Sequence, residues 1–283
     1  MKSYRLTRSF LILIGAFICS NAFSQYKGDS WADVQAKGSG KLSIVYYEIS
    51  GMIEQKSDGQ LSGVCVDILN DFVAFVEKQY GKKLTLDFVA KEKVFSDFLS
   101  KSRKSSNVLA VSTISITDER KEQMKFTPAF MPNPLVFLTH KNAPTISNLN
   151  SVSSQLKGYR AMAIKGGNNQ GYLEYVKEKY YPELQVKLKP SEKVILKEMQ
   201  SNTQSFTILD FTDYYDVIKK KLPLKRQKVN LSHFKEEFGF VMSDDSDWGE
   251  VWNAFLTPSY KNSMSYKKAI MTNLGSTFAS LVN

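Results

Sequence analysis

The chain has 283 residues, of which 42% are hydrophobic, and it carries a formal net charge of +10. This length and apolar content are enough for one large domain or two lobes of ordinary size, and they exclude a disordered chain. The densest basic group surrounds a turn at Pro223 without interleaved aromatic residues, so we expect a solvated face and no nucleic-acid partner. The group consists of Lys219, Lys220, Lys221, Lys225, Arg226 and Lys228.

The first 24 residues have the pattern of a signal peptide. Three basic residues precede an apolar stretch at 10–18, and small residues at Ala22 and Ser24 suit a signal peptidase. The apolar stretch is too short to span a membrane. We therefore predict export to the periplasm, with a mature chain that starts near Gln25 and has 35 basic and 28 acidic residues, a net charge of +7.

The two cysteines have different expected roles. Cys19 offers an alternative to cleavage, a lipid anchor, but Ile18 stands where lipoprotein processing needs a small residue. In the mature chain Cys65 is then the only cysteine, so no intrachain disulfide can form. Because it lies between two valines, we expect a buried, unreactive thiol.

Strands and helices alternate in the first half of the chain. Apolar residues recur at helical spacing until Gly81, and short apolar runs flank this segment. Such an alternation predicts a parallel sheet wound with helices. The expected elements are strands at 42–47, 84–89 and 108–111 and helices at 66–80 and 94–99.

The same order repeats in the second half. A strand at 135–138 lies between prolines and is typical of a connector, and 149–156 is expected to cap the second unit. The remaining expected elements are strands at 160–164, 184–188, 205–209 and 238–242 and helices at 172–179, 191–200, 248–255 and 264–282.

The simplest architecture for this repeat is an α/β fold of two doubly wound lobes joined by two crossing strands. We predict the crossings near 134–138 and 232–240. Lobe 1 then consists of 25–133 and 236–283, and lobe 2 of 134–235. The cleft between the lobes is the expected ligand site.

Unusual polar residues cluster where three predicted strands end. Thr113, Ser115 and Arg120 follow one strand, the turn 166–169 follows a second, and Asp210 ends a third. Ligands of open parallel sheets bind beyond these strand ends, where helix N-termini also supply N–H donors. The pattern therefore predicts that these residues meet in one site.

The residue types indicate a site for a zwitterion. Arg120 can hold a carboxylate in a bidentate fork, and Asp210 can accept from an ammonium group. Three alternatives stay open: Arg120 can lie at the surface or pair with a local acid, Asp210 can cap a helix that begins at 211–214, and Asp213 competes for either role of Asp210. The turn 166–169 lacks the Gly-Lys-Ser/Thr ending of a phosphate loop, which argues against nucleotide binding.

Four segments resemble a known family, in the same order and spacing. The family is the family-3 bacterial solute-binding proteins, the periplasmic amino-acid-binding components of ABC importers. The resemblance covers about residues 30–283, and its most specific part is the arginine segment. The segments are DGQLSGVCVDILNDFVAF (58–75), STISITDERKEQMKFTPAF (112–130), AIKGGNNQGYLEYV (163–176) and EFGFVMSDDSDWGEVWNAFL (237–256).

The resemblance implies a type II periplasmic binding fold that closes around one small ligand. It implies that Arg120 holds the ligand α-carboxylate and that Thr113 and Ser115 line the same pocket. It further implies that Asn168 is the helix-start residue after the Gly-rich turn. Asp210 is then the acid that binds the α-amino group of the ligand.

The first loop departs from the family pattern. The resemblance implies an aromatic residue packed on the ligand, for which Tyr47 is the candidate, but the loop lacks the usual prolines. Gly167 and Asn168 stand where the family commonly has threonine. Glu48 can form a negative wall for a basic ligand or lie in solvent.

We expect a monomeric binding protein that delivers an amino acid or related carboxylate to a membrane permease, without a cofactor or metal. One alternative is an enzyme, since some proteins of this fold are dehydratases of small cyclic acids. His140 and His233 have no motif that links them to a nucleophile or metal, so we expect structural roles for them. A second alternative is a ligand-sensing module for a separate receptor.

Overall fold

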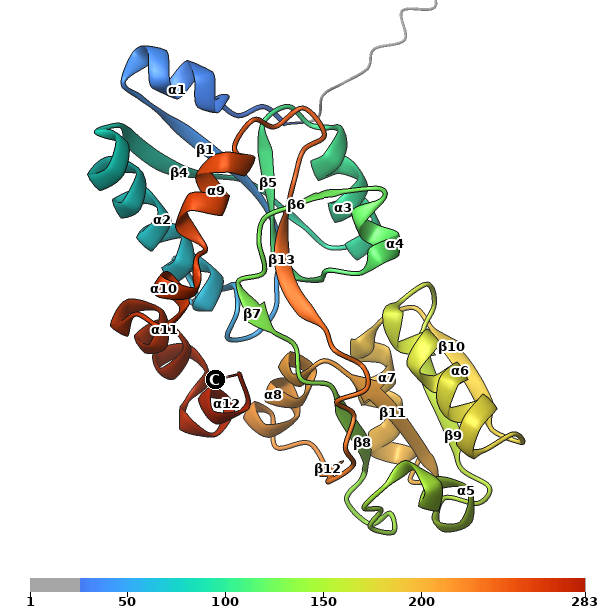
Figure 1. Cartoon of the computed structure of the whole chain (residues 1–283). Coiled ribbons are helices and arrows are strands. Elements are labelled where there is room, and N and C mark those ends of the chain that lie inside the picture. Colours follow the sequence, from blue (N-terminus) through green and yellow to red (C-terminus); the bar gives the residue numbers. More distant parts are fainter. Residues whose placement is uncertain (1–25, 283) are drawn as a thin grey trace, which may run out of the picture.

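The computed structural model describes residues 26–282, so the predicted leader at 1–24, with Cys19, lies outside the described residues. Two β-sheets, one in each half of Figure 1, organise the chain. We refer to each sheet with its helices as a lobe. Within the described residues, no helix is both long enough and apolar enough to cross a membrane.

The first sheet has the strand order β4-β1-β5-β13-β6, with β7 paired to β13. β4, β1 and β5 are parallel, as predicted, whereas β13 runs antiparallel to β5. The predicted parallel order of the first three strands is therefore confirmed, and the antiparallel β13 belongs to the second predicted crossing. The strands are β1 (Ser39–Tyr47), β4 (Lys83–Glu92), β5 (Val108–Ser115), β6 (Lys125–Phe126), β7 (Met131–Pro132) and β13 (Glu237–Met242).

Helices cover both faces of the first sheet. Ile44 and Val111 point into the large core on the side of α2, while Val45 and Ala110 pack against α3 on the other side. Two-sided burial explains why these strands read as continuous apolar runs. The helices are α1 (Trp31–Lys37), α2 (Val64–Tyr80), α3 (Phe95–Lys104), α4 (Asp118–Lys121), α9 (Gly249–Phe255), α10 (Pro258–Lys261), α11 (Met264–Leu274) and α12 (Ser276–Val282).

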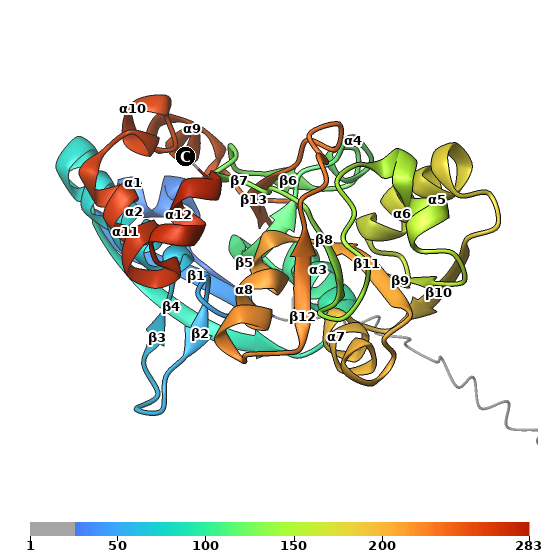
Figure 2. The same cartoon turned by 90° about the horizontal axis from the view of Figure 1, so that it is seen from below.

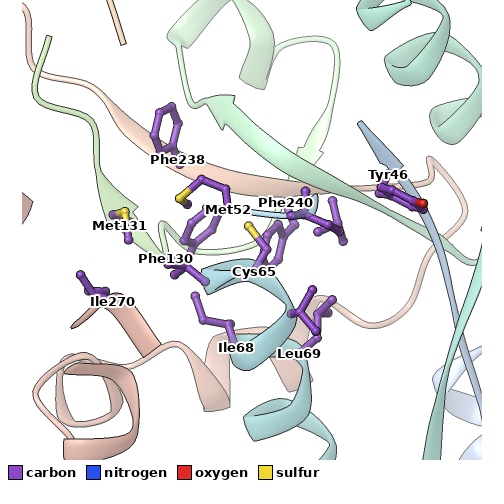
Figure 3. Packing of buried hydrophobic residues seen from close by; sticks show 14 of the residues in the cluster. Tyr46, Met52, Cys65, Ile68, Leu69, Phe130, Met131, Phe238, Phe240 and Ile270 are labelled. Atoms are coloured by element: carbon purple, nitrogen blue, oxygen red, sulfur yellow. The ribbon is translucent and has the colours of Figure 1, made fainter. Parts of the chain in front are cut away.

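The start of α2 is packed against the loop that follows β1. Gly63 has a φ of +128°, and a Cβ there would lie 2.3 Å from the carbonyl oxygen of Met52, so only glycine fits this approach. Cys65 follows in the core beside Phe130 and Phe240 (Figure 3). Its thiol is free and fully buried, as predicted, and burial raises its pKa.

The second sheet has the order β10-β9-β11-β8-β12. β10, β9 and β11 are parallel, and β8 and β12 add an antiparallel edge. The strands are β8 (Val136–His140), β9 (Arg160–Ile164), β10 (Gln185–Lys189), β11 (Ser205–Leu209) and β12 (Leu224–Gln227). The helical segments are a 3₁₀ turn (Leu149–Ser151), α5 (Val152–Gln155), α6 (Asn168–Tyr180), α7 (Glu192–Ser201) and α8 (Phe211–Lys219).

The chain crosses between the sheets twice, from β7 to β8 and from β12 to β13. Asn133 lies in the first crossing and Glu236 in the second, and both are buried. The predicted boundaries after residues 133 and 235 fall within these segments. We propose that the crossings are the hinge between the lobes.

The C-terminal helices reach back to the second lobe. One helix was predicted over 264–282, but Gly275, with φ +80°, breaks it into α11 and α12. Phe278 of α12 contacts Tyr215 of α8, with 5.2 Å between ring centroids. Figures 1 and 2 both place α12 beside α8. A short hairpin, β2 (Glu54–Gln55) and β3 (Leu61–Ser62), projects from the first lobe near α2 (Figure 2).

Candidate functional site

A cavity of about 490 Å³ is lined by residues of both lobes. Its volume is in the range of small-molecule sites. The first lobe contributes the ends of β1 and β5, α4 and the segment before α3, and the second contributes the first turns of α6, α7 and α8. The structure brings together all six residues predicted to contact a ligand: Tyr47, Thr113, Ser115, Arg120, Asn168 and Asp210.

Two hydrogen bonds to neighbouring residues hold Arg120 in the cavity wall, one from its backbone and one from its side chain. Its N–H donates to Thr117 Oγ1 (3.2 Å) at the start of α4, and its Nη1 donates to the carbonyl oxygen of Ser115 (3.0 Å). The guanidinium lies 5.9 Å from the ring centroid of Phe95. Burial lowers the pKa of Arg120, and the negative charges of Glu236 and Asp210 oppose that shift. The remaining guanidinium donors can serve an anionic ligand.

Thr113 and Ser115 were predicted to follow a strand that ends at residue 111. Instead, β5 continues through Ser115, and every residue of the strand is buried. The end of β5 therefore contributes three hydroxyl residues to the cavity lining: Ser112, Thr113 and Ser115. The hydroxyl of Ser112 is buried and has no hydrogen-bond partner.

Glu236 is the centre of a hydrogen-bond network behind the cavity. Its Oε2 accepts from Ser115 Oγ (2.5 Å) and from Asn133 Nδ2 (2.9 Å), and its Oε1 accepts from Asn168 Nδ2 (3.2 Å). The donors come from the first lobe, the first crossing and the second lobe. We did not predict Glu236 or Asn133, because neither has a local signal beyond its place in a crossing segment.

Asp210 occupies the N-cap position of α8 but does not cap it through its side chain. Its Oδ1 instead accepts from Asn133 Nδ2 (2.8 Å). Burial raises the pKa of Asp210, and the hydrogen bond from Asn133 and the charge of Arg120 oppose the rise. Of the two readings of Asp210, the helix cap is therefore wrong.

Two further acids, Asp213 and Glu192, line the cavity in the first turns of α8 and α7. Burial raises the pKa of Asp213 well above its ordinary range, and repulsion from Asp210 and Glu192 adds to the rise. From the sequence, Asp213 was expected only as a competitor of Asp210. Glu192 follows Ser191 at a helix start, and nothing in that pattern marks it as a cavity residue.

Tyr47 lies at the end of β1, in an aromatic group with Phe95 and Phe98. The ring centroids are 5.5 Å and 6.0 Å from that of Tyr47. Burial, with the charges of Glu192 and Asp213, raises the pKa of Tyr47 to about 12, so its hydroxyl stays neutral.

Glu48 is not among the residues that line the cavity. Its carboxylate forms an ion pair with Lys91 (2.6 Å) and accepts from the N–H of Gln55 (2.9 Å). The acidic wall of the cavity comes from the second lobe instead.

The Gly-rich turn leads directly into α6. The periodicity predicted the helix from residue 172, whereas α6 begins at Asn168, the helix-start position that the family resemblance implied. Gly166 in the turn has a φ of +72°. Asn169 lines the cavity and accepts from the N–H of Ile164 (3.0 Å), while its Nδ2 is buried and has no partner. The first N–H groups of a helix also lack intrahelical partners.

The histidines lie away from the cavity lining. His140 is buried at the end of β8, where its Nδ1 accepts from the N–H of Asn142 (3.2 Å), and His233 stacks on Tyr175. Across residues 26–282, no group of three or more His, Cys, Asp and Glu side chains could hold a metal ion.

Comparisons with solved structures identify the fold. A substrate-binding protein of an ABC uptake transporter from Streptococcus pneumoniae, with bound histidine, matches with TM-score 0.65 and 17% identity over 88% of this chain and 97% of that chain. The arginine-, lysine-, histidine-binding protein ArtJ from Geobacillus stearothermophilus matches with TM-score 0.60 and 20% identity, over 83% and 96%. The GluR0 ligand-binding core from Nostoc punctiforme, in complex with L-glutamate, matches with TM-score 0.61 and 17% identity, over 83% and 100%.

At these identities the likeness shows the fold, which is the two-lobed type II periplasmic binding fold. A search of curated proteins gave no match. The family model of the bacterial extracellular solute-binding proteins, family 3, matches residues 47–270. That range includes both crossings, every residue that lines the cavity and all strands of the two sheets except β1, of which only Tyr47 lies inside it. The chain therefore belongs to the bacterial extracellular solute-binding proteins, family 3.

Proposed function

We propose that this protein is exported and captures a small amino acid between its lobes for uptake by an ABC importer. The observation that supports this most is the pairing of Arg120 and Asp210 across one cavity. Arg120 lies on the first lobe and Asp210 on the second, and their charges influence each other. A zwitterion can satisfy both groups, because a buried charge needs an opposite charge or hydrogen bonds nearby.

The ligand carboxylate would bind to the free guanidinium donors of Arg120, and the N–H groups at the start of α6, around Asn168, would support it. The ammonium group would bind to Asp210. The Ser115 hydroxyl donates its proton to Glu236, so towards the ligand its oxygen can only accept a hydrogen bond. It can therefore bind the ligand ammonium group but not the carboxylate. Thr113 lies on the same strand and lines the same cavity.

Closure of the lobes would report that the site is occupied. Each lobe contributes one charge of the pair, so a bound zwitterion holds the closed arrangement together. In this proposal the protein acts as a monomer, and a permease recognises its closed form. Neither histidine lines the cavity, and no observation favours the dehydratase or the sensor over the binding protein.

A ligand screen tests this function. The protein is unfolded and refolded to remove any bound compound, and its melting temperature is measured with each of the twenty amino acids. A ligand at 100 times its Kd stabilises the folded state by about 2.7 kcal/mol, which shifts the melting temperature by several degrees. If no amino acid produces a shift, the proposed ligand class is wrong. Mass spectrometry of compounds released on unfolding identifies what the protein carries from cells.

Export is tested separately. We expect the protein in the osmotic-shock fraction, with an intact mass that corresponds to cleavage before Gln25. Lipidation at Cys19 would instead give a membrane-associated protein with a larger mass. A cytoplasmic protein that still carries residues 1–24 would contradict export.

A further inference from the structure

One wall of the cavity carries more negative charge than a simple amino acid needs. The first turns of α7 and α8 contribute three carboxylates, those of Glu192, Asp210 and Asp213. Among residues 26–282 there are nine ion pairs within 4.0 Å, and none of them includes these three acids. One α-ammonium group can neutralise only one of them.

The first-lobe wall of the same cavity carries a cation and an aromatic group. Phe95 lies next to both Arg120 and Tyr47, because its ring centroid is 5.9 Å from the Arg120 guanidinium and 5.5 Å from the ring centroid of Tyr47. Burial and the charges of Glu192 and Asp213 raise the pKa of Tyr47. A ligand that extends from Arg120 past Phe95 to Tyr47 therefore meets first an anion site and then acceptors for a cation.

Helix capping does not account for Glu192 and Asp213. The cap of α7 is Ser191, whose Oγ accepts from the N–H of Val194 (3.4 Å), so Glu192 is not needed for it. Glu192 Oε1 is buried and has no hydrogen-bond partner. Asp213 lies near the backbone N–H of Asp210, as the third residue of a capping box does. That contact can occupy one of its two carboxylate oxygens.

Other cations of the protein do not fill this place. Lys93 and Lys165 line the cavity but are exposed residues, and neither is among the nine ion pairs within 4.0 Å. A metal ion does not fit either, because the described residues contain no set of three suitable ligands. In the ligand-free protein a proton on Asp213 relieves part of the repulsion, and in the complex a cationic group of the ligand can take its place.

We propose that the ligand is an α-amino acid whose side chain ends in a guanidinium or ammonium group, held by Asp213 and Glu192 against the ring of Tyr47. This assignment rests on the proposed function, since it uses Arg120 and Asp210 for the α-carboxylate and α-ammonium groups. The flat face of an aromatic ring attracts a cation, and two carboxylates supply the hydrogen-bond acceptors. The specificity residues would then be Asp213 and Glu192.

The test compares pairs of amino acids that differ only in the charge of the side chain. Arginine and citrulline have nearly the same size, but only arginine carries a cation, and lysine and norleucine form a second pair. Isothermal titration calorimetry gives the Kd of each. We expect arginine to bind more than about tenfold more tightly than citrulline, the effect of a buried charge pair.

Variants locate the effect. Asp213→Asn and Glu192→Gln should each lower the arginine-to-citrulline affinity ratio by about tenfold or more, because they remove charge without changing size. Glu183→Gln is the matched control, since Glu183 is an exposed acid of the second lobe outside the cavity lining, and it should leave the ratio unchanged. Circular dichroism shows whether each variant folds. If Asp213→Asn does not fold, the arginine-to-citrulline affinity ratios of Glu192→Gln and of the wild type still test the proposal.

The outcomes separate this inference from the function on which it rests. Equal or tighter binding of citrulline, or a preference for neutral or acidic amino acids, overturns the cation site and leaves the amino-acid-binding function intact. Binding of none of the amino acids overturns both. A preference for arginine that neither variant weakens places the cation elsewhere and overturns the assignment to these two residues.

Discussion

The hydroxyl of Ser115 donates to Glu236 Oε2 over 2.5 Å, and this bond joins the last residue of β5 to the second crossing segment. The same carboxylate accepts from Asn133 in the first crossing and from Asn168 in the second lobe. One buried side chain thus links both lobes and both crossing segments.

Glu236→Gln should lower the free energy of unfolding by about 1–3 kcal/mol. The amide has one acceptor oxygen where the carboxylate has two, so at least one buried donor loses its partner, and the weaker acceptor lengthens the others. Urea denaturation measures the loss. Glu237→Gln is the control, because Glu237 is the exposed neighbour on β13 and should change stability by less than about 0.5 kcal/mol. Equal effects of the two substitutions would contradict a structural role of Glu236.

Elements with a strong apolar pattern were predictable from the sequence. The prediction found β1, α2, β5 and β13, each of which buries apolar residues in the core. A buried face requires apolar residues at regular spacing, and this spacing is visible in the sequence. β12 was missed because its sequence, Leu-Lys-Arg-Gln, is polar, and it joins the sheet only as an edge strand. α1 was missed because only Val34 of its residues is buried.

The site was predictable only where a residue stands at a position that the fold defines. Arg120 and Asp210 follow strands whose ends meet in the cleft, so the topology alone brings them together. Glu236 and Glu192 were not predictable in this way. Their surroundings depend on how the lobes face each other, and no local spacing in the sequence carries that information.

Arg120→Ala should remove ligand-induced thermal stabilisation while leaving the fold intact. Loss of a charged bidentate partner costs about 2–5 kcal/mol of binding free energy, or more than about thirtyfold in Kd. Melting curves with and without ligand measure the effect. Arg103→Ala, which removes only an ion pair with Asp244 (3.4 Å) at the surface, is the control. Unchanged affinity in Arg120→Ala would exclude Arg120 from the site.

The raised pKa of Asp213 predicts a pH dependence of stability in the ligand-free protein. The folded state holds this proton more tightly than the unfolded state, because of burial and of repulsion from Asp210, Glu192 and Asp216. From about pH 4, the ordinary range of a carboxyl group, up to the raised pKa, the folded state therefore binds more protons. In that window the free energy of unfolding falls as pH rises.

Asp213→Asn should remove this dependence, because the amide does not titrate. The stability of the wild type relative to the variant should therefore decrease between pH 4 and pH 7, measured by urea denaturation at each pH. A constant difference for Asp213→Asn would show that its proton is not held by the fold.

Two kinds of contact join α8 to the first lobe, and they should differ in strength. The ion pair of Lys219 with Glu54 (2.9 Å) is largely solvated, with 44% and 29% of the side chains exposed, so it should contribute less than about 1 kcal/mol. Phe278 is 4% exposed and packs against Phe211, Tyr214 and Tyr215 of α8.

Phe278→Ala should therefore destabilise the protein by about 3 kcal/mol, the usual cost of removing a buried phenylalanine side chain. Lys219→Ala should cost less than about 1 kcal/mol, and raising the salt concentration should shrink its effect but not that of Phe278→Ala. Urea denaturation at low and high salt measures both. Hydrogen exchange should also show faster exchange in α8 for Phe278→Ala alone, because the aromatic contact holds this helix, and with it Asp210 and Asp213, against the first lobe. If Lys219→Ala had the larger effect at either salt concentration, the lobes would be joined by charge and not by apolar packing.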